Sequence, residues 1–303
     1  MNLNALSLKH VIPSQGAVIH AVTSLGDEVF VAFYYSEDIE VYDAESFTLH
    51  RYLTVPGLES PCYGLAACIS NNCLYASNWQ NSSIHRVDLS GGSAVMKWSV
   101  ASQPAGLSVN KAHNVVVACH WLSKLHEYTT HGTLVREISL EQTGLTNPWH
   151  AVQLSTGDYV VNQCTSPGVV SVVGVDGQVV CSYDQSQMSN VGPMNQPRGL
   201  AVMKNGNILV ADHSNNRILS MNSALSSVQA LLVDCGIQQP FALCLDESRG
   251  RLYVSDYDVY GVNGGGRVLV FCNDDGTVHS EPEPVGTYDY DHYGVMNDYC
   301  RHW

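Results

Sequence analysis

The chain has 303 residues, of which 45% are hydrophobic and only 14% charged, and it contains 25 glycines and 16 tyrosines. This balance is typical of packed sheets joined by tight turns and excludes a disordered chain. Twenty-eight acidic against fourteen basic side chains give a net charge of −14. That charge disfavours general affinity for the phosphate backbone of nucleic acids.

The start of the chain, MNLNALSLKH, lacks the basic segment followed by an apolar run that a secretory signal needs. No later stretch reaches the length of about 18 uninterrupted apolar residues that a membrane-spanning helix requires. We therefore expect a soluble, cytoplasmic protein with no membrane partner.

One motif recurs along the chain. Residues 196–222, QPRGLAVMKNGNILVADHSNNRILSMN, comprise an apolar entry, a turn, a second apolar strand, a polar loop and a third strand. The entry recurs six times, as IHAV, YGLAA, AGLSV, WHAVQL, RGLAV and FALCL, and successive copies are 43, 42, 45, 48 and 43 residues apart. A repeat of forty-odd residues built from short strands predicts the four-stranded blades of a propeller.

The remaining strands of each repeat have clear signals. Each second strand is a short apolar run, such as NILVA or RLYVS, which suits a strand buried between neighbouring blades. Glycine-containing turns near residues 91, 131 and 176 join the third and fourth strands. The sequence thus predicts an all-β fold, a six-bladed β-propeller of four-stranded antiparallel blades.

The segment ILVADHSNNRI resembles the signature of NHL repeats, and the six-fold pattern covers about residues 16–272. The resemblance is to the NHL domains of tripartite-motif proteins, and it implies a propeller that binds its partners through loops on one face. Blades one and four keep the strands but lose the Asp-x-x-Asn-x-Arg loop. The resemblance therefore supports the fold more than an inherited function.

The ends of the chain must close the ring. Residues 1–272 are predicted to form the propeller, with residues 1–15 supplying the outer strand of the last blade. The competing closure uses the segment TVHS at 277–280. Residues 273–303 form an acidic, tyrosine-rich tail without strand alternation.

Candidate binding residues follow from the fold. Loops that enter the inner strands and loops that join second to third strands lie on the same face of a propeller. Aromatic side chains with polar tips, which binding hot spots favour, occupy many of these positions. We expect this face to bind a protein or peptide through Tyr34, Trp79, His120, Trp121, Trp149, His150, Arg198, His213, Phe241 and Tyr257.

Single-stranded RNA is a further candidate partner, because the resemblance implies RNA binding by some NHL domains. Aromatic rings would stack on bases, and Arg198, Arg217 and Lys124 would contact phosphates. The acidic residues on the same loops, among them Asp212 and Asp256, oppose this interpretation.

An enzyme acting on a small molecule in the channel is the other alternative. Its candidate catalytic residues are His20, His150, Arg198 and Tyr63. An NHL-like amidating lyase holds zinc with three entry-position histidines, and this chain supplies two of them. We predict no cofactor; zinc or calcium held by His20, His150 and Asp212 is the alternative.

Overall fold

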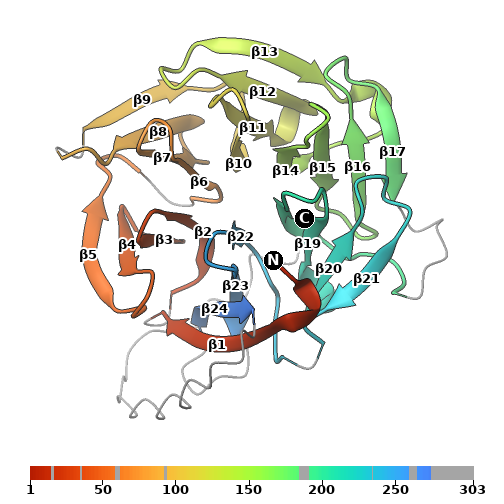
Figure 1. The fold of residues 1–303 in the computed structure, drawn as a ribbon. Coiled ribbons are helices and arrows are strands. Elements are labelled where there is room, and N and C mark those ends of the chain that lie inside the picture. Colours follow the sequence, from red (N-terminus) through yellow and green to blue (C-terminus); the bar gives the residue numbers. More distant parts are fainter. Residues whose placement is uncertain are drawn as a thin grey trace, which may run out of the picture.

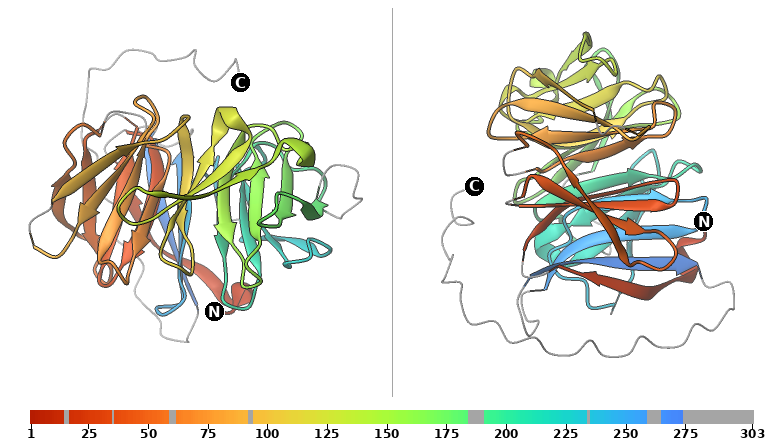
Figure 2. Two further views of the ribbon diagram at one scale, coloured as in Figure 1. Left: turned by 90° about the horizontal axis from the view of Figure 1, so that it is seen from above. Right: turned by 90° about the vertical axis from the view of Figure 1, so that its left-hand side faces the viewer.

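The computed structural model confirms a six-bladed β-propeller (Figure 1). It describes residues 1–14, 17–34, 36–58, 62–91, 94–183, 191–233, 235–258 and 265–273. Six four-stranded antiparallel sheets stand in a ring around a central channel, each with one strand at the channel and one at the outside. Figure 2 shows the ring edge-on, with strands running between its two faces and loops lying on both faces.

The blades follow one another along the chain. Blade one contains β2 (Ile19–Leu25), β3 (Glu28–Phe33), β4 (Asp38–Asp43) and β5 (Leu49–Thr54), and blade two contains β6 (Leu65–Cys68), β7 (Cys73–Asn78), β8 (Ser83–Asp88) and β9 (Val95–Ser99). Blade three contains β10 (Pro104–Val109), β11 (Val115–Cys119), β12 (Lys124–Tyr128) and β13 (Leu134–Ser139), and blade four contains β14 (Pro148–Gln153), β15 (Tyr159–Gln163), β16 (Val169–Val173) and β17 (Val179–Tyr183). Blade five contains β18 (Pro197–Val202), β19 (Ile208–Asp212), β20 (Arg217–Met221) and β21 (Val228–Leu231).

The sixth blade joins the two ends of the described chain. Its strands are β22 (Leu243–Asp246), β23 (Arg251–Asp258), β24 (Gly265–Asn273) and, as the outermost strand, β1 (Leu6–Pro13). β1 pairs antiparallel with β24, from Leu6 opposite Asn273 to Pro13 opposite Arg267. The sheet therefore holds the ring closed through backbone hydrogen bonds between distant parts of the sequence. The segment 277–280 and nearly all of the predicted tail lie outside the described residues.

The hydrophobic core is divided among the interfaces between blades. Six clusters of buried side chains each combine residues of two neighbouring blades. In β3 and β11 every residue from Val29 to Phe33 and from Val115 to Cys119 is buried. Both faces of such a strand are covered by adjacent blades, which explains the continuous apolar runs in the sequence.

Helical structure is limited to short turns in the described chain. Four 3-10 helices occur: η1 (Leu3–Ala5), η2 (His120–Leu122), η3 (Glu141–Thr143) and η4 (His213–Asn215). None of them is long enough to cross a lipid bilayer. η2 and η4 carry two of the predicted binding histidines between the second and third strands of their blades.

Candidate functional site

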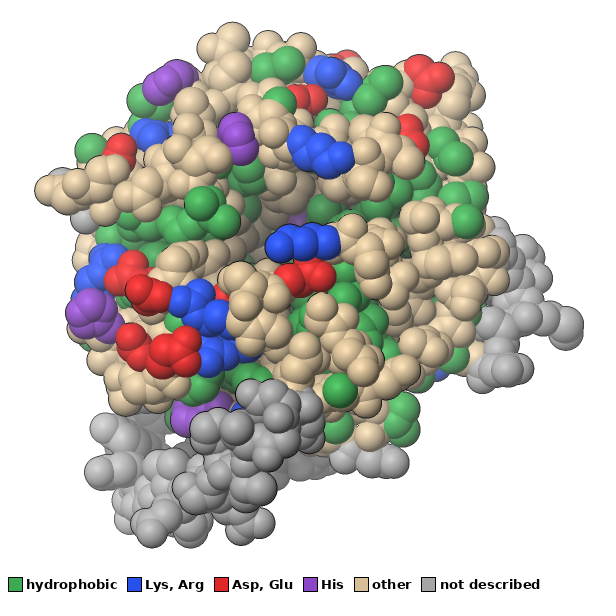
Figure 3. Space-filling model, in the orientation of Figure 1, with side chains coloured by type: hydrophobic (Ala, Val, Ile, Leu, Met, Phe, Trp, Pro, Cys, Tyr) green, Lys and Arg blue, Asp and Glu red, His purple; other side chains and the backbone are tan. Residues whose placement is uncertain are grey.

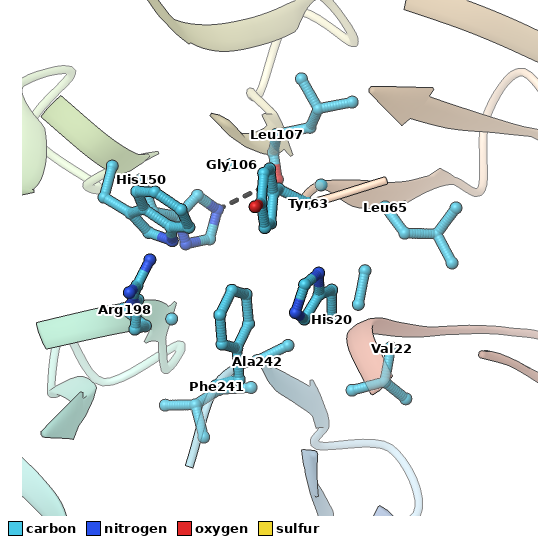
Figure 4. Close-up of a pocket in the computed structure, with 15 residues that line it drawn as sticks. His20, Val22, Tyr63, Leu65, Gly106, Leu107, His150, Arg198, Phe241 and Ala242 are labelled. Atoms are coloured by element: carbon cyan, nitrogen blue, oxygen red, sulfur yellow. Dashed lines mark hydrogen bonds between the residues drawn. The ribbon is translucent and has the colours of Figure 1, made fainter. Parts of the chain in front are cut away.

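Irregular pairing at the start of the inner strands directs side chains into the channel. The register between the first and second strands shifts at His20 in blade one, at Trp149 in blade four, and at Arg198 and Gly199 in blade five. A β-bulge of this kind leaves a residue out of the ladder and re-aims its side chain. Figure 4 shows His20, Tyr63, Arg198 and Phe241 converging on the channel from different blades.

Polar side chains of the second strands stabilise these bulges. The fully buried Asn162 accepts a hydrogen bond from the backbone N–H of His150 at 2.8 Å and donates to the carbonyl oxygen of Arg198 at 2.7 Å. Ser77 and Ser255 accept backbone N–H groups at the corresponding places in blades two and six. Asn162 thus positions Arg198 from the neighbouring blade, a role that sequence reasoning missed. The sequence feature that could have identified Asn162 is a polar residue within an otherwise apolar strand.

Glycines bring the inner strands close together and narrow the channel. A Cβ atom at Gly106 would lie 2.5 Å from the Cδ2 atom of His150, and one at Gly199 would lie 2.7 Å from the carbonyl oxygen of Phe241. The cavity lined by the inner strands is only about 40 Å³. Pockets that enclose small organic ligands are about 300–1,000 Å³, so this cavity is too small to enclose one. A larger ligand would lie on the mouth of the channel.

The mouth of the channel is covered by rings that touch one another. Ring centroids of contacting pairs are 4.5 to 6.4 Å apart, as is usual for stacked and edge-to-face aromatic pairs. His20 stacks on both Tyr63 and Phe241, and Trp79 contacts Trp149. We call this group the aromatic cluster; its members, drawn from all six blades, are His20, Tyr34, Tyr63, Trp79, His120, Trp121, Trp149, His213 and Phe241.

The aromatic cluster is part core and part surface. Its members His20, His120 and Trp149 are buried. Trp79 is half-buried, whereas 42% of Trp121 is exposed to solvent. The buried rings hold the others in place, so the mouth presents rigid aromatic surface to solvent.

Arg198 lies within this aromatic environment. Its guanidinium carbon is 4.1 Å from the ring centroid of Trp149 and 5.1 Å from that of Phe241. Within the described residues its side chain has no ion-pair or hydrogen-bond partner, and its Nε atom is shielded from solvent. Cation–π contacts with the two rings offset part of the cost of desolvating the charge.

The histidines around Arg198 are uncharged at neutral pH. Burial, together with the positive charge of Arg198, lowers the pKa of His20 and of His213 to about 3. Burial lowers the pKa of His120 to about 4, against the opposing effect of its hydrogen bond to the Pro148 carbonyl oxygen. Arg198 therefore carries the positive charge of this group of four side chains.

His150 is bonded to backbone on both sides of its ring. Its Nε2 donates to the carbonyl oxygen of Leu107 at 3.0 Å, drawn as a dashed line in Figure 4, and its Nδ1 accepts the N–H of Leu200 at 3.0 Å. The ring bridges blades three and five and leaves no nitrogen for a metal ion or for proton transfer.

The residues proposed to hold zinc or calcium do not fit a metal ion. His150 has no free nitrogen, and the carboxylate of Asp212 already binds Asn215 and Arg217. Within the described residues no three His, Cys, Asp or Glu side chains are grouped to hold one.

The Asp-x-x-Asn-x-Arg loop of blade five is a structural unit. The buried Asp212 pairs with Nε of Arg217 at 2.6 Å and accepts Nδ2 of Asn215 at 2.9 Å. Arg217 and Asn215 also donate to the carbonyl oxygen of Pro193. The signature residues thus fix the loop that enters the blade.

Blade six contains the same device at a wider spacing. The buried Asp256 pairs with Nε of Arg267 at 2.8 Å and accepts the backbone N–H of Gln238 at 2.9 Å. The sequence analysis placed Asp256 among the acidic residues of the loop face, whereas its carboxylate is buried in this ion pair. Tyr257 follows it on β23, and no ring contact among the described residues joins it to the aromatic cluster.

The family model of the NHL repeat matches residues 194–219, which include the Asp212 loop. No curated protein matches the sequence with significant similarity. Among solved structures, a streptogramin B lyase is similar at 12% identity and a TM-score of 0.61, covering 88% of this chain and 98% of its own.

Two further solved structures share the fold. A catalytically inactive virginiamycin B lyase from Staphylococcus aureus with quinupristin has 11% identity and a TM-score of 0.61, covering 89% of each chain. A chain of a nidogen/laminin complex has 19% identity and a TM-score of 0.61, covering 76% of this chain and 86% of its own. At these identities the likeness is one of fold.

Proposed function

This chain is an NHL-repeat β-propeller, and we propose that it binds a protein or peptide partner at the mouth of its channel. The observation that carries the proposal is the continuous aromatic cluster, to which all six blades contribute. Large rings with polar tips, held rigid before binding, are the side chains that dominate protein interfaces.

The narrow channel supports binding at the mouth. Its cavity of about 40 Å³ is too small for an organic substrate, whereas a peptide segment can lie across the exposed rings. The structure of a propeller chain in a nidogen/laminin complex is a precedent for this fold in a protein complex. The fold itself does not decide the function, because lyases share it.

Two tryptophans of the aromatic cluster provide the test. We expect Trp79→Ala combined with Trp121→Ala to abolish capture of peptides selected by display on the wild-type protein, because Trp121 is exposed and the half-buried Trp79 contacts it. Tyr52→Ala is the matched control, because this ring is 58% exposed but lies on the outer strand β5. Unfolding curves would verify that each variant is folded. Equal capture by the double variant and the wild type would refute the site.

A further inference from the structure

We propose that Arg198 binds a carboxylate group of the peptide ligand, either an acidic side chain or the C-terminus. This inference rests on the proposed function and names the chemistry that the site recognises. Its starting point is that a half-buried guanidinium, which has no counter-ion among the described residues, lies at the centre of the aromatic mouth.

Three further cations on this side of the ring are already paired in the part of the chain that the structure describes. Arg217 contacts Asp212, Arg267 contacts Asp256, and Lys124 contacts Glu137 at 2.7 Å. On the other face, seen in Figure 3, several positive and negative side chains lie beside one another at the lower left. Arg198 differs from these cations, because aromatic rings rather than carboxylates surround it. A desolvated charge of this kind is costly until a ligand supplies the opposite charge.

The surroundings of Arg198 favour an anion and not a second cation. His20 lines the same cavity, is buried, and has a shielded Nδ1 atom without a hydrogen-bond partner in the described chain. Tyr63 and Phe241 line the cavity as well. The guanidinium can donate two parallel hydrogen bonds to a planar carboxylate, while the rings exclude water and strengthen the attraction.

A single unpaired charge selects a carboxylate over a nucleic acid. Binding along an RNA strand requires several cations that follow the phosphates. Two of the three basic residues considered for that role, Arg217 and Lys124, are neutralised by their own carboxylates. With a net charge of −14 on the chain, a polyanion would also be repelled. One isolated negative group on an otherwise uncharged or aromatic peptide fits better.

The first experiment uses a small probe with the full chain. Phenylacetate and its uncharged analogue phenylacetamide would be titrated by ligand-observed NMR against the wild type, Arg198→Met and Lys124→Gln. We expect phenylacetate to bind the wild type about tenfold more tightly than the amide, a difference of about 1.4 kcal/mol, because only the carboxylate forms hydrogen bonds between charged groups with Arg198. Arg198→Met should remove this preference, and Lys124→Gln, which removes a positive charge on the same side, should retain it. No preference in the wild type, or an unchanged preference in Arg198→Met, would overturn the proposal.

The second experiment identifies the source of the carboxylate. A display-selected peptide would be remade with a C-terminal amide, and separately with each Asp changed to Asn and each Glu to Gln. We expect one of these changes to weaken binding to the wild type about tenfold and to have no further effect on Arg198→Met.

If every change is neutral, the carboxylate proposal is wrong and peptide binding stands. If phenylacetate binds but no peptide does, the proposed function is wrong, and the carboxylate that Arg198 binds does not belong to a peptide. An oligouridylate that binds more tightly than any peptide would overturn both.

Discussion

The guanidinium carbon of Arg198 lies 4.1 Å from the centroid of the Trp149 ring. The register shift that leaves Arg198 out of the ladder, and the hydrogen bond that Asn162 donates to its carbonyl oxygen, fix this position from two blades. A charge that is held in place by backbone geometry and has no carboxylate partner in the described chain is suited to binding and adds little to stability.

Stability measurements on Arg198 test this interpretation. Arg198→Met keeps an unbranched side chain that can pack against the rings and removes the charge. We expect its free energy of unfolding to lie within about 1 kcal/mol of the wild type, because the lost cation–π energy is offset by the desolvation cost that is avoided. Urea unfolding at pH 7.5 would measure the difference. A loss of more than about 2 kcal/mol would mean that Arg198 has a structural role.

Arg217 provides the contrasting case. Arg217→Met leaves the fully buried Asp212 without its cation and removes donors to the loop at Pro193. Breaking a buried ion pair from one side costs about 3–5 kcal/mol. The same unfolding experiment should therefore separate the two arginines clearly. Equal effects of the two substitutions would contradict the distinction between a binding and a structural cation.

The strands, the repeat and the face of the site could be predicted from the sequence, because apolar periodicity and turn residues are local signals. The contacts of individual side chains could not. His150 occupies an entry position like that of a ligand-binding residue, yet its ring is enclosed between two neighbouring inner strands because Gly106 and Leu200 approach it closely. That approach depends on the packing of three blades, which no local pattern encodes.

The pairing of Asp256 with Arg267 was hidden for a related reason. In blade five the partners are five positions apart, and the signature is visible in the sequence. In blade six they are eleven positions apart, although in both blades they lie directly opposite each other on adjacent strands. A motif defined by spacing along the chain misses such a contact, because the two blades share the pairing of the strands and not the number of residues between the partners.

The two hydrogen bonds of His150 make it a stability determinant. His150→Ala would leave the carbonyl oxygen of Leu107 and the N–H of Leu200 unpaired inside the ring of inner strands. Unsatisfied buried groups cost about 1–3 kcal/mol each, so we expect a loss of about 3 kcal/mol or more. His131→Ala, in an exposed turn, is the control and should be nearly neutral. If the His150 variant and the wild type had the same midpoint concentration of denaturant, the bridging role would be refuted.

The neutral histidines also predict how stability depends on pH. Burial lowers the pKa of His20 to about 3 and those of His120 and His150 to about 4, whereas in the unfolded chain each pKa is near 6.5. Between pH 6.5 and 4 the unfolded chain therefore takes up protons that the folded protein does not, and stability is lost as pH falls. At pH 5 each histidine could account for up to about 2 kcal/mol, at about 1.4 kcal/mol per pKa unit.

Urea unfolding at pH 7.5, 6.0 and 5.0 would measure this dependence. Carboxylates whose pKa is lowered by hydrogen bonds, such as Asp43 and Asp88, titrate below this range. Burial raises the pKa of Glu40, which adds stability as pH falls, so a net loss of stability between pH 6.5 and 5 comes from the histidines. The His150→Ala variant should show a shallower slope than the wild type, since one of the groups responsible is removed. A wild-type free energy of unfolding that stays constant from pH 7.5 to 5.0 would show that these rings accept protons in the folded state, and Arg198 would then not be the sole positive charge at the mouth in mild acid.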